Sequence, residues 1–267
     1  MSTTAHFLDI MWRDKPVSVE YAWVGELNAP GPVMVFLHEG LGSVSMWHDF
    51  PHEMCKLLGI KGLVYSRPAY GLSTPRDSEG LWDVDFLHQQ ALEVLPKVIE
   101  GLKLNEPVWL FGHSDGGSIA LLSAAHYSGL VAGVVVLAPH LFVEDLTIQS
   151  IVQARDHYRA GGLKERLSRY HADVDSAFYG WNTIWLKPEF KYWSIEDEVA
   201  KIQCPILAIQ GEQDPYGTME QVNRIKKLAD QAVVIEIDDC GHSPHKDQTQ
   251  VLMSVVKDYF EKVNAVQ

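Results

Sequence analysis

Short, nearly continuous apolar runs recur along the chain, and longer stretches of mixed polarity separate them. The runs are VMVFLH (33–38), GLVYS (62–66), VWLFG (108–112), VAGVVVLA (131–138) and PILAIQG (205–211). Runs of this kind are typical of strands buried on both faces of a parallel sheet. QAVVIEID (231–238) predicts one more strand, and the alternation in VSVEYAW (17–23) predicts a half-buried antiparallel strand.

Helical spacing of apolar residues fills the gaps between these strands. Residues 84–102 carry apolar side chains at mostly three- and four-residue intervals, and a helical pattern is also present at 117–127 and near 246–262. Pro96 interrupts the first stretch, which predicts a kink or two abutting helices. The alternation of strands and helices predicts a doubly wound, mostly parallel α/β sheet.

The alternation stops between residues 140 and 202, where aromatic side chains are frequent and no strand pattern occurs. We interpret this segment as a helical lid over one end of the sheet, with residues 1–139 and 203–267 forming the core. Gly161, Gly162 and Gly180 are candidate flexible points in the lid. Its basic residues are expected to form a solvated helix face, and these are Arg155, Arg159, Lys164, Arg166 and Arg169.

Composition narrows the class of partner. The 267 residues have a formal net charge of −13 and contain no basic run, which argues against nucleic acid as a partner. Cys55, Cys204 and Cys240 lie far apart and without metal-ligand spacing, so we expect neither a disulfide framework nor a metal site. The N-terminal stretch lacks the pattern of a signal peptide, and the longest apolar run is too short to span a bilayer. We expect a soluble, cytoplasmic protein.

The stretch FGHSDGGS (111–118) is the clearest chemical signal in the chain. Gly112-His113-Ser114-Asp115-Gly116 has the pattern G-x-S-x-G, directly after a predicted strand and at the start of a predicted helix. In that setting a tight turn lifts the serine oxygen above the edge of the sheet. Ser114 is therefore the candidate nucleophile.

A serine hydroxyl needs a base to become a nucleophile, and the base needs an acid to orient it. DDCGHSPHKD (238–247) places His242 in a loop after the last predicted strand, and His245 in the same loop is its rival. QGEQDPYGT (210–218) places Asp214 just beyond the preceding strand. Glu144 and Asp145 follow an earlier strand and are alternative acids. Ser114, Asp214 and His242 all follow strand ends, where open α/β sheets place their sites.

Together these motifs resemble the α/β-hydrolase superfamily, in its lid-bearing group of small esterases and carbon–carbon bond hydrolases. FLHEGLGS (36–43), YSRPAYGLS (65–73), GEQD (211–214) and GHSPH (241–245) extend the resemblance over almost the whole chain. It implies an eight-stranded sheet with the lid inserted between strands 6 and 7, and the chain order Ser114, Asp214, His242 for the catalytic residues. It also implies an oxyanion hole made by the N–H groups of Asp115 and of Gly40, with Leu41 as the alternative to Gly40.

Two carboxylates are expected beside that oxyanion hole, and each requires an explanation. Glu39 stands where the family commonly has glycine, and an ionised carboxylate aimed into the hole would oppose the developing charge. We expect it to point away or to be paired, with Arg67 as a plausible partner. Asp115 should lie in the first turn of the following helix, whose positive end favours a carboxylate, with its side chain facing away from the site.

These observations predict a serine hydrolase that cleaves an apolar carboxylic ester and needs no metal or organic cofactor. Leu41, Trp181 and Trp185 are the candidate pocket residues, and the substrate is expected to be a small apolar ester or ketone. A carbon–carbon hydrolase of vinylogous diketones uses the same three residues and remains an alternative. So does a ligand-binding receptor built on this fold, because a fold alone does not establish an activity. The oligomeric state is left open, with a homodimer among the options.

Overall fold

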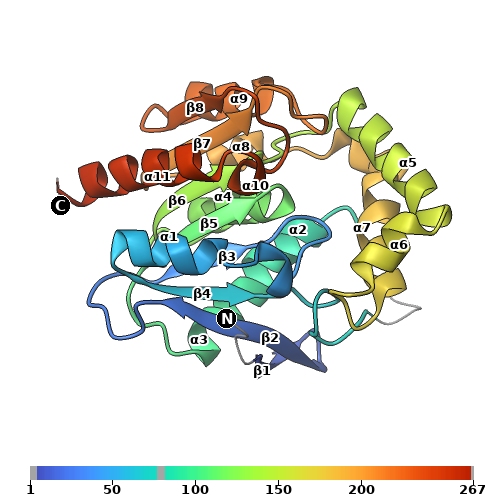
Figure 1. The fold of residues 1–267 in the computed structure, drawn as a ribbon, viewed down its shortest axis with the longest axis horizontal. Coiled ribbons are helices and arrows are strands. Elements are labelled where there is room, and N and C mark those ends of the chain that lie inside the picture. Colours follow the sequence, from blue (N-terminus) through green and yellow to red (C-terminus); the bar gives the residue numbers. More distant parts are fainter. Residues whose placement is uncertain (1–4, 77–81, 266–267) are drawn as a thin grey trace.

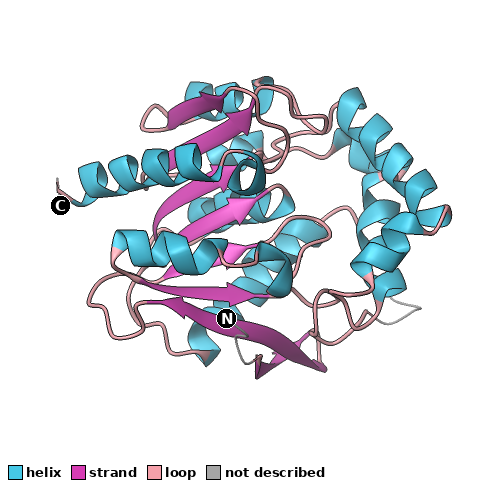
Figure 2. Cartoon of the chain, in the orientation of Figure 1, coloured by secondary structure: helices cyan, strands magenta, loops and turns pink. Residues whose placement is uncertain are grey.

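The computed structural model describes residues 5–76 and 82–265 and contains one eight-stranded sheet (Figure 2). The strand order is β1-β2-β4-β3-β5-β6-β7-β8, antiparallel at the β1/β2 and β2/β4 pairs and parallel across the rest. The strands are β1 (His6–Trp12), β2 (Lys15–Gly25), β3 (Met34–Leu37), β4 (Lys61–Tyr65), β5 (Val108–His113), β6 (Val131–Leu137), β7 (Ile206–Gly211) and β8 (Val233–Ile237). The predicted doubly wound α/β class is confirmed.

Helices cover both faces of this sheet. The core helices are η1 (Ser45–Trp47), α1 (Phe50–Leu58), α2 (Phe86–Gln89), η2 (Gln90–Val94), α3 (Leu95–Gly101), α4 (Asp115–His126), α9 (Glu220–Leu228), α10 (Pro244–Asp247) and α11 (Thr249–Asn264). The predicted interruption at Pro96 is present as a change of helix type, because the π-helical turn η2 lies between α2 and α3. Pro96 lies in the first turn of α3, directly after this π-helical turn, which interrupts the regular hydrogen-bond series at the place where proline lacks an N–H.

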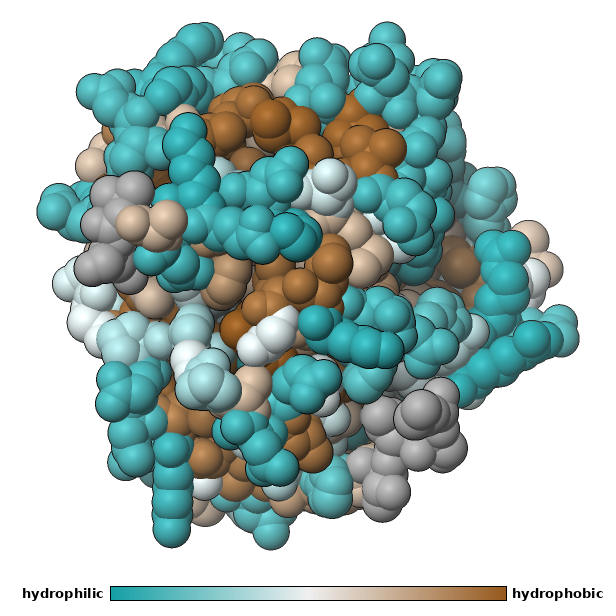
Figure 3. Space-filling model, turned by 60° about the vertical axis from the view of Figure 1, so that its left-hand side comes forward, coloured by the Kyte–Doolittle hydropathy of each residue, from teal (hydrophilic) through white to brown (hydrophobic). Residues whose placement is uncertain are grey.

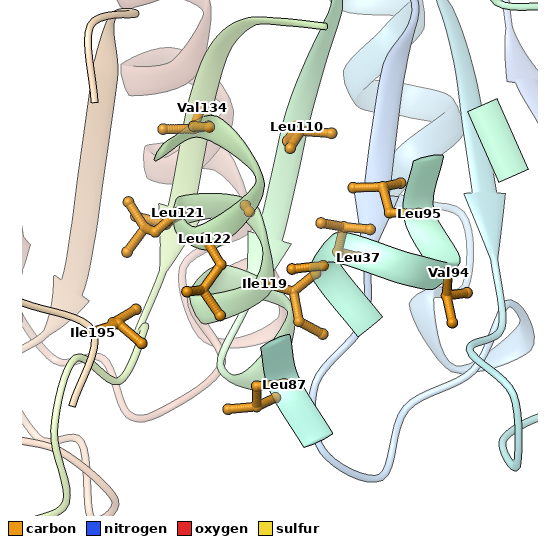
Figure 4. Close-up of a cluster of buried hydrophobic side chains, with 14 of the residues drawn as sticks. Leu37, Leu87, Val94, Leu95, Leu110, Ile119, Leu121, Leu122, Val134 and Ile195 are labelled. Atoms are coloured by element: carbon orange, nitrogen blue, oxygen red, sulfur yellow. The ribbon is translucent and has the colours of Figure 1, made fainter. Parts of the chain in front are cut away.

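Alternate residues of the central strands pack into two separate apolar layers. Val35 and Leu37 of β3 face the layer of α3 and α4, whereas Met34 and Phe36 face the layer of α1 and α11. Figure 4 shows part of the first layer, in which side chains of β3, β5 and β6 meet those of α4 and of the α2–α3 region. Burial on both faces explains why these strands read as continuous apolar runs.

The chain between β6 and β7 forms the helices expected of the inserted segment. They are α5 (Asp145–Arg159), α6 (Gly162–Leu167), α7 (Val174–Trp185), η3 (Pro188–Tyr192) and α8 (Glu196–Val199). Figure 1 shows α5, α6 and α7 standing beyond the carboxyl ends of the parallel strands, while α8 lies against the sheet's helical layer. The predicted basic face is largely solvated, and only Arg155 among its five residues is half-buried.

No helix of the part of the chain that the structure describes is long and apolar enough to cross a membrane.

Candidate active site

Ser114 occupies a sharp turn between β5 and α4. Its backbone has a φ of 53° and a ψ of −119°, an unusual conformation for a residue with a side chain. The turn needs glycine on both sides, because a Cβ at Gly112 would collide with the carbonyl of Gly116 and a Cβ at Gly116 with that of Leu37. This is the strand–turn–helix geometry expected from the G-x-S-x-G pattern.

Two loops at the same edge of the sheet bring His242 and Asp214 to this serine. Nε2 of His242 lies 2.9 Å from Oγ of Ser114, and Nδ1 lies 2.9 and 2.8 Å from the two carboxylate oxygens of Asp214. Asp214 follows β7 and His242 follows β8, so parallel strands that end side by side carry all three groups. The ring is held with Nδ1–H toward the acid and the Nε2 lone pair toward the serine.

The carboxylate of Asp214 is fixed by further donors. The side-chain amide of Gln210 donates to Oδ2 at 2.7 Å, and the N–H of Tyr216 donates to Oδ1 at 2.7 Å. Burial alone would raise the pKa of Asp214, but the hydrogen bond and charge of His242, with the N–H of Tyr216, hold it below its ordinary value. Asp214 is therefore an ionised orienting group at neutral pH.

The alternative residues lie elsewhere. His245 is buried in α10, with its ring 4.9 Å from that of Trp47, and burial lowers its pKa to about 2. The carboxylate of Glu144 accepts hydrogen bonds from Thr218 and Gln221, and Asp145 pairs with Lys191 at the surface. None of these side chains contacts Ser114 or His242 in a hydrogen bond.

The loop after β3 lies opposite the turn of Ser114. The N–H of Gly42 donates to the carbonyl of Glu39 at 3.1 Å, which closes a tight turn around Gly40 and Leu41. Within residues 5–76 and 82–265, the N–H groups of Gly40, Leu41 and Asp115 donate to no protein acceptor. Donors of this kind on both sides of a serine are the components of an oxyanion hole.

The structure corrects the expected partner of Glu39. Arg67 does not pair with its carboxylate but donates to its backbone carbonyl at 2.8 Å. The carboxylate instead lies 3.7 Å from Nδ1 of His113 and 4.0 Å from the amino group of Lys246. Burial would raise the pKa of Glu39, but the contact with His113 and the charge of Lys246 outweigh it and hold the pKa well below its usual range. Glu39 therefore carries a negative charge beside the site.

The structure also changes the account of Asp115. The first-turn position in α4 is as expected, but the helix end is not the only group that meets the carboxylate, because the side chain is buried, 1% exposed. Its Oδ1 accepts the indole N–H of Trp185 at 3.2 Å, and its Oδ2 lies 3.7 Å from the guanidinium of Arg67. Burial raises the pKa of Asp115 to about 6, against the opposing effects of Arg67 and Trp185.

A cavity of about 160 Å³ lies over Ser114, and the segment between β6 and β7 lines its outer side. Leu41, Trp181 and Trp185, the three predicted pocket residues, all line it. The other lining residues are Glu39, Gly40, Ser114, Asp115, His140, Thr147, Ile151, Ala154, Leu163, Tyr216 and His242. Among the residues that the structure describes, this lining contains two carboxylates and no lysine or arginine.

A larger apolar groove of about 630 Å³ lies far from this site, between β7, β8 and α11. In Figure 3 apolar side chains gather over these elements near the top of the view. Val233, Ile235, Val255 and Val263 contribute to its walls. Among the described residues its lining holds no paired nucleophile and base, so the smaller cavity is the candidate site.

Two residues that support the site carry little or no signal in the sequence. His171, in the segment between β6 and β7, accepts the N–H of Gly71 at Nδ1 and donates from Nε2 to the carbonyl of Leu41 at 3.0 Å. His113 donates from Nε2 to the backbone carbonyl of His242 at 2.7 Å. Only its position beside the serine singles out His113, and nothing in the local sequence singles out His171.

The fold and this site define a hydrolase of the α/β type. Residues 34–254 match the model of the alpha/beta hydrolase family, and the chain belongs to this family. It is 26% identical over 254 residues to monoglyceride lipase of Homo sapiens. This alignment covers 86% of this chain and 80% of that protein.

Solved structures share the fold. A carboxylesterase of Nitrososphaera gargenis superposes with a TM-score of 0.79 at 14% identity, covering 97% of this chain and all of the other. The meta-cleavage product hydrolase of Pseudomonas fluorescens IP01 superposes with a TM-score of 0.72 at 16% identity, covering 96% and 97%. At such identities these likenesses establish the architecture.

Proposed function

We propose that this protein cleaves a small or medium apolar carboxylic ester through an acyl-enzyme. The observation that carries the proposal is the hydrogen-bonded series from Ser114 Oγ to His242 and on to the carboxylate of Asp214. A serine oxygen, an imidazole and a carboxylate in this order are the components of acyl transfer. The unpaired N–H groups of Gly40 and Asp115 supply the oxyanion donors.

In this mechanism Ser114 Oγ attacks the acyl carbon and its proton passes to Nε2 of His242. Asp214 stabilises the resulting imidazolium, and the N–H groups of Asp115 and Gly40 bind the oxyanion. His242 then donates the proton to the departing alcohol. A water molecule attacks the acyl-enzyme, His242 accepts its proton, and the return of that proton to Ser114 releases the acid.

The size and polarity of the cavity support a short, uncharged acyl group. Its volume of about 160 Å³ and its walls of Leu41, Ile151, Trp181 and Trp185 suit a short aliphatic or small aromatic group. Residues 140–202, which supply both tryptophans, act in this proposal as the lid that keeps water from the reacting carbonyl.

The charges around the cavity distinguish the ester from the main alternative. The dienoate substrates of carbon–carbon hydrolases carry a carboxylate, which needs a cation in a pocket of low polarity. The lining offers Glu39 and Asp115 instead, and the guanidinium of Arg67 is fully buried behind Asp115. This arrangement favours a neutral ester over an anionic substrate.

The test is hydrolysis of p-nitrophenyl esters from acetate to octanoate by the wild type and by Ser114→Ala. We expect turnover that is fastest for the short chains and that Ser114→Ala abolishes. Folded wild-type protein that cleaves none of these esters would contradict the proposal. A dienoate substrate and ligand-binding assays would then test the carbon–carbon hydrolase and the receptor.

A further inference from the structure

We infer that Arg67, Trp181 and Trp185 form a clamp that sets the spacing between the two oxyanion donors, and that the clamp is complete only when the lid segment is seated. This inference rests on the proposed acyl transfer at Ser114. Arg67 and Trp185 are positioning residues in it, because they act on the donors through Glu39 and Asp115.

Arg67 connects the two backbone segments that carry the oxyanion donors, the loop of Gly40 and the start of α4, on their buried side. Its guanidinium donates to the carbonyl of Glu39 at 2.8 Å, directly before Gly40, and lies 3.7 Å from the carboxylate of Asp115. The backbone N–H of Arg67 donates to Nε2 of His38 at 3.0 Å, and Nδ1 of that ring lies 2.7 Å from the carbonyl of Glu39. A single fully buried side chain thus contacts both the loop of Gly40 and the helix that begins at Asp115.

The lid contacts the same two backbone segments on the side opposite Arg67. Trp181 and Trp185 lie one helical turn apart on α7 and so share a face. Trp181 packs so closely on Gly40 that a Cβ there would collide with its indole, and Trp185 donates to Asp115. His171 adds a third contact through its hydrogen bond to the carbonyl of Leu41. Movement of α7 therefore changes the surroundings of both donors together.

The charge arrangement agrees with a positioning role better than with a purely stabilising one. Buried ion pairs contribute little net stability, because desolvation offsets the attraction. Here the facing atoms, one guanidinium nitrogen of Arg67 and Oδ2 of Asp115, are both buried without a hydrogen-bond partner in the described structure. The pair holds a carboxylate beside an N–H that must bind an oxyanion, and the guanidinium offsets its negative field.

The test compares Trp185→Phe and Arg67→Lys with the control Trp193→Phe. Trp193 is also buried near α7, but its indole N–H has no acceptor among the described residues, so the control removes an equivalent group without breaking a hydrogen bond. Each protein is assayed for kcat and KM on p-nitrophenyl acetate. The affinity of an alkyl trifluoromethyl ketone, whose hemiketal with Ser114 places an oxyanion in the hole, is measured in parallel.

The clamp predicts that Trp185→Phe and Arg67→Lys lower kcat about tenfold or more, with KM within about twofold of wild type, since loss of a whole donor costs about 100- to 1,000-fold. The ketone should bind more weakly by the same factor as kcat. In ¹⁹F NMR the hemiketal hydroxyl should titrate about one pH unit higher, which corresponds to that tenfold loss.

The control and the double variant give the results that would contradict the clamp. If Trp185→Phe and Arg67→Lys match Trp193→Phe in ketone affinity and in the ¹⁹F titration, or change only stability and KM, the clamp is wrong. If the neutral double variant Arg67→Met/Asp115→Asn recovers full activity, charge balance alone explains Arg67. Wild type that neither cleaves the ester nor forms the hemiketal overturns the proposed function, and the clamp with it.

Discussion

Both carboxylate oxygens of Asp214 lie within 2.9 Å of Nδ1 of His242, so one ring nitrogen is held by two acceptors. The opposite ring nitrogen faces Ser114 at 2.9 Å. This arrangement selects the tautomer in which Nε2 is free to accept the serine proton.

Asp214→Asn is expected to reduce kcat by about 10⁴-fold, because an amide can donate to Nδ1 and stabilise the wrong tautomer. KM should change little, since the cavity walls are untouched. Asp145→Asn is the matched control: this rival acid is exposed and, among the described residues, pairs only with Lys191, so activity should stay at the wild-type level. Equal losses in the two variants would contradict the assignment of Asp214.

Gly40→Ala should reduce kcat about 100-fold, since its new methyl group would collide with the indole of Trp181 and displace the oxyanion loop. The double variant Gly40→Ala/Trp181→Ala removes the collision and should recover part of the loss. The measurement is a double-mutant cycle in kcat/KM, with an expected coupling of about 1–3 kcal/mol. Additive losses would show that the two residues do not interact.

Glu39 should make the enzyme discriminate against anionic substrates. Its pKa lies well below the usual range, so it stays ionised across the neutral range, and a like charge about 8 Å away costs about 2 kcal/mol at an effective dielectric of about 20. We expect p-nitrophenyl valerate to be cleaved at least about tenfold more efficiently than the p-nitrophenyl monoester of glutaric acid.

Substitutions at Glu39 and at its neighbour Lys246 should change the preference for the neutral ester in opposite directions. Glu39→Gln should narrow the preference for the neutral ester, whereas Lys246→Gln, which removes the cation 4.0 Å from Glu39, should widen it. The ratio of kcat/KM for the two esters is the measurement, at low ionic strength to limit screening. A ratio that both variants leave unchanged would exclude Glu39 as the source of selectivity.

Asp115 should make stability fall as pH rises from about 4 to 7. Burial raises its pKa to about 6 in the folded state from 3.8, so the folded protein holds a proton that the unfolded chain releases. The resulting stability is fully present below the unfolded pKa and is lost as pH rises through the folded one, up to about 3 kcal/mol in all.

Urea unfolding of wild type and Asp115→Asn between pH 4 and 7.5 tests this. As pH rises, wild type should lose unfolding free energy relative to Asp115→Asn, whichever of the two proteins is the more stable at pH 4. Asp145→Asn, at an exposed position, should run parallel to wild type. Parallel curves for Asp115→Asn would mean that the raised pKa is wrong.

The pattern of apolar residues predicted the architecture well, because a strand that is buried on both faces appears in the sequence as a continuous apolar run. Each apolar run became a strand of the parallel region, and the alternating run 17–23 lies within the antiparallel β2. The first strand, β1, lacks such a mark because it is an edge strand with most of its side chains at the surface.

The candidate site was accessible from sequence for a related reason. Ser114, Asp214 and His242 each follow a strand, and the carboxyl ends of neighbouring parallel strands meet at one edge. Local patterns and this topological rule together select three residues that the fold brings within hydrogen-bonding distance.

The sequence by itself thus determined the parallel part of the sheet, the antiparallel β2, the helical segment after β6 and the candidates for nucleophile, base and acid. Only the tertiary structure decided which charges neutralise one another: Arg67 faces Asp115 and not the carboxylate of Glu39, and Trp185 reaches Asp115 from 70 residues away. Pairings of this kind depend on side-chain direction and burial between distant segments, and neither leaves a periodic trace along the chain.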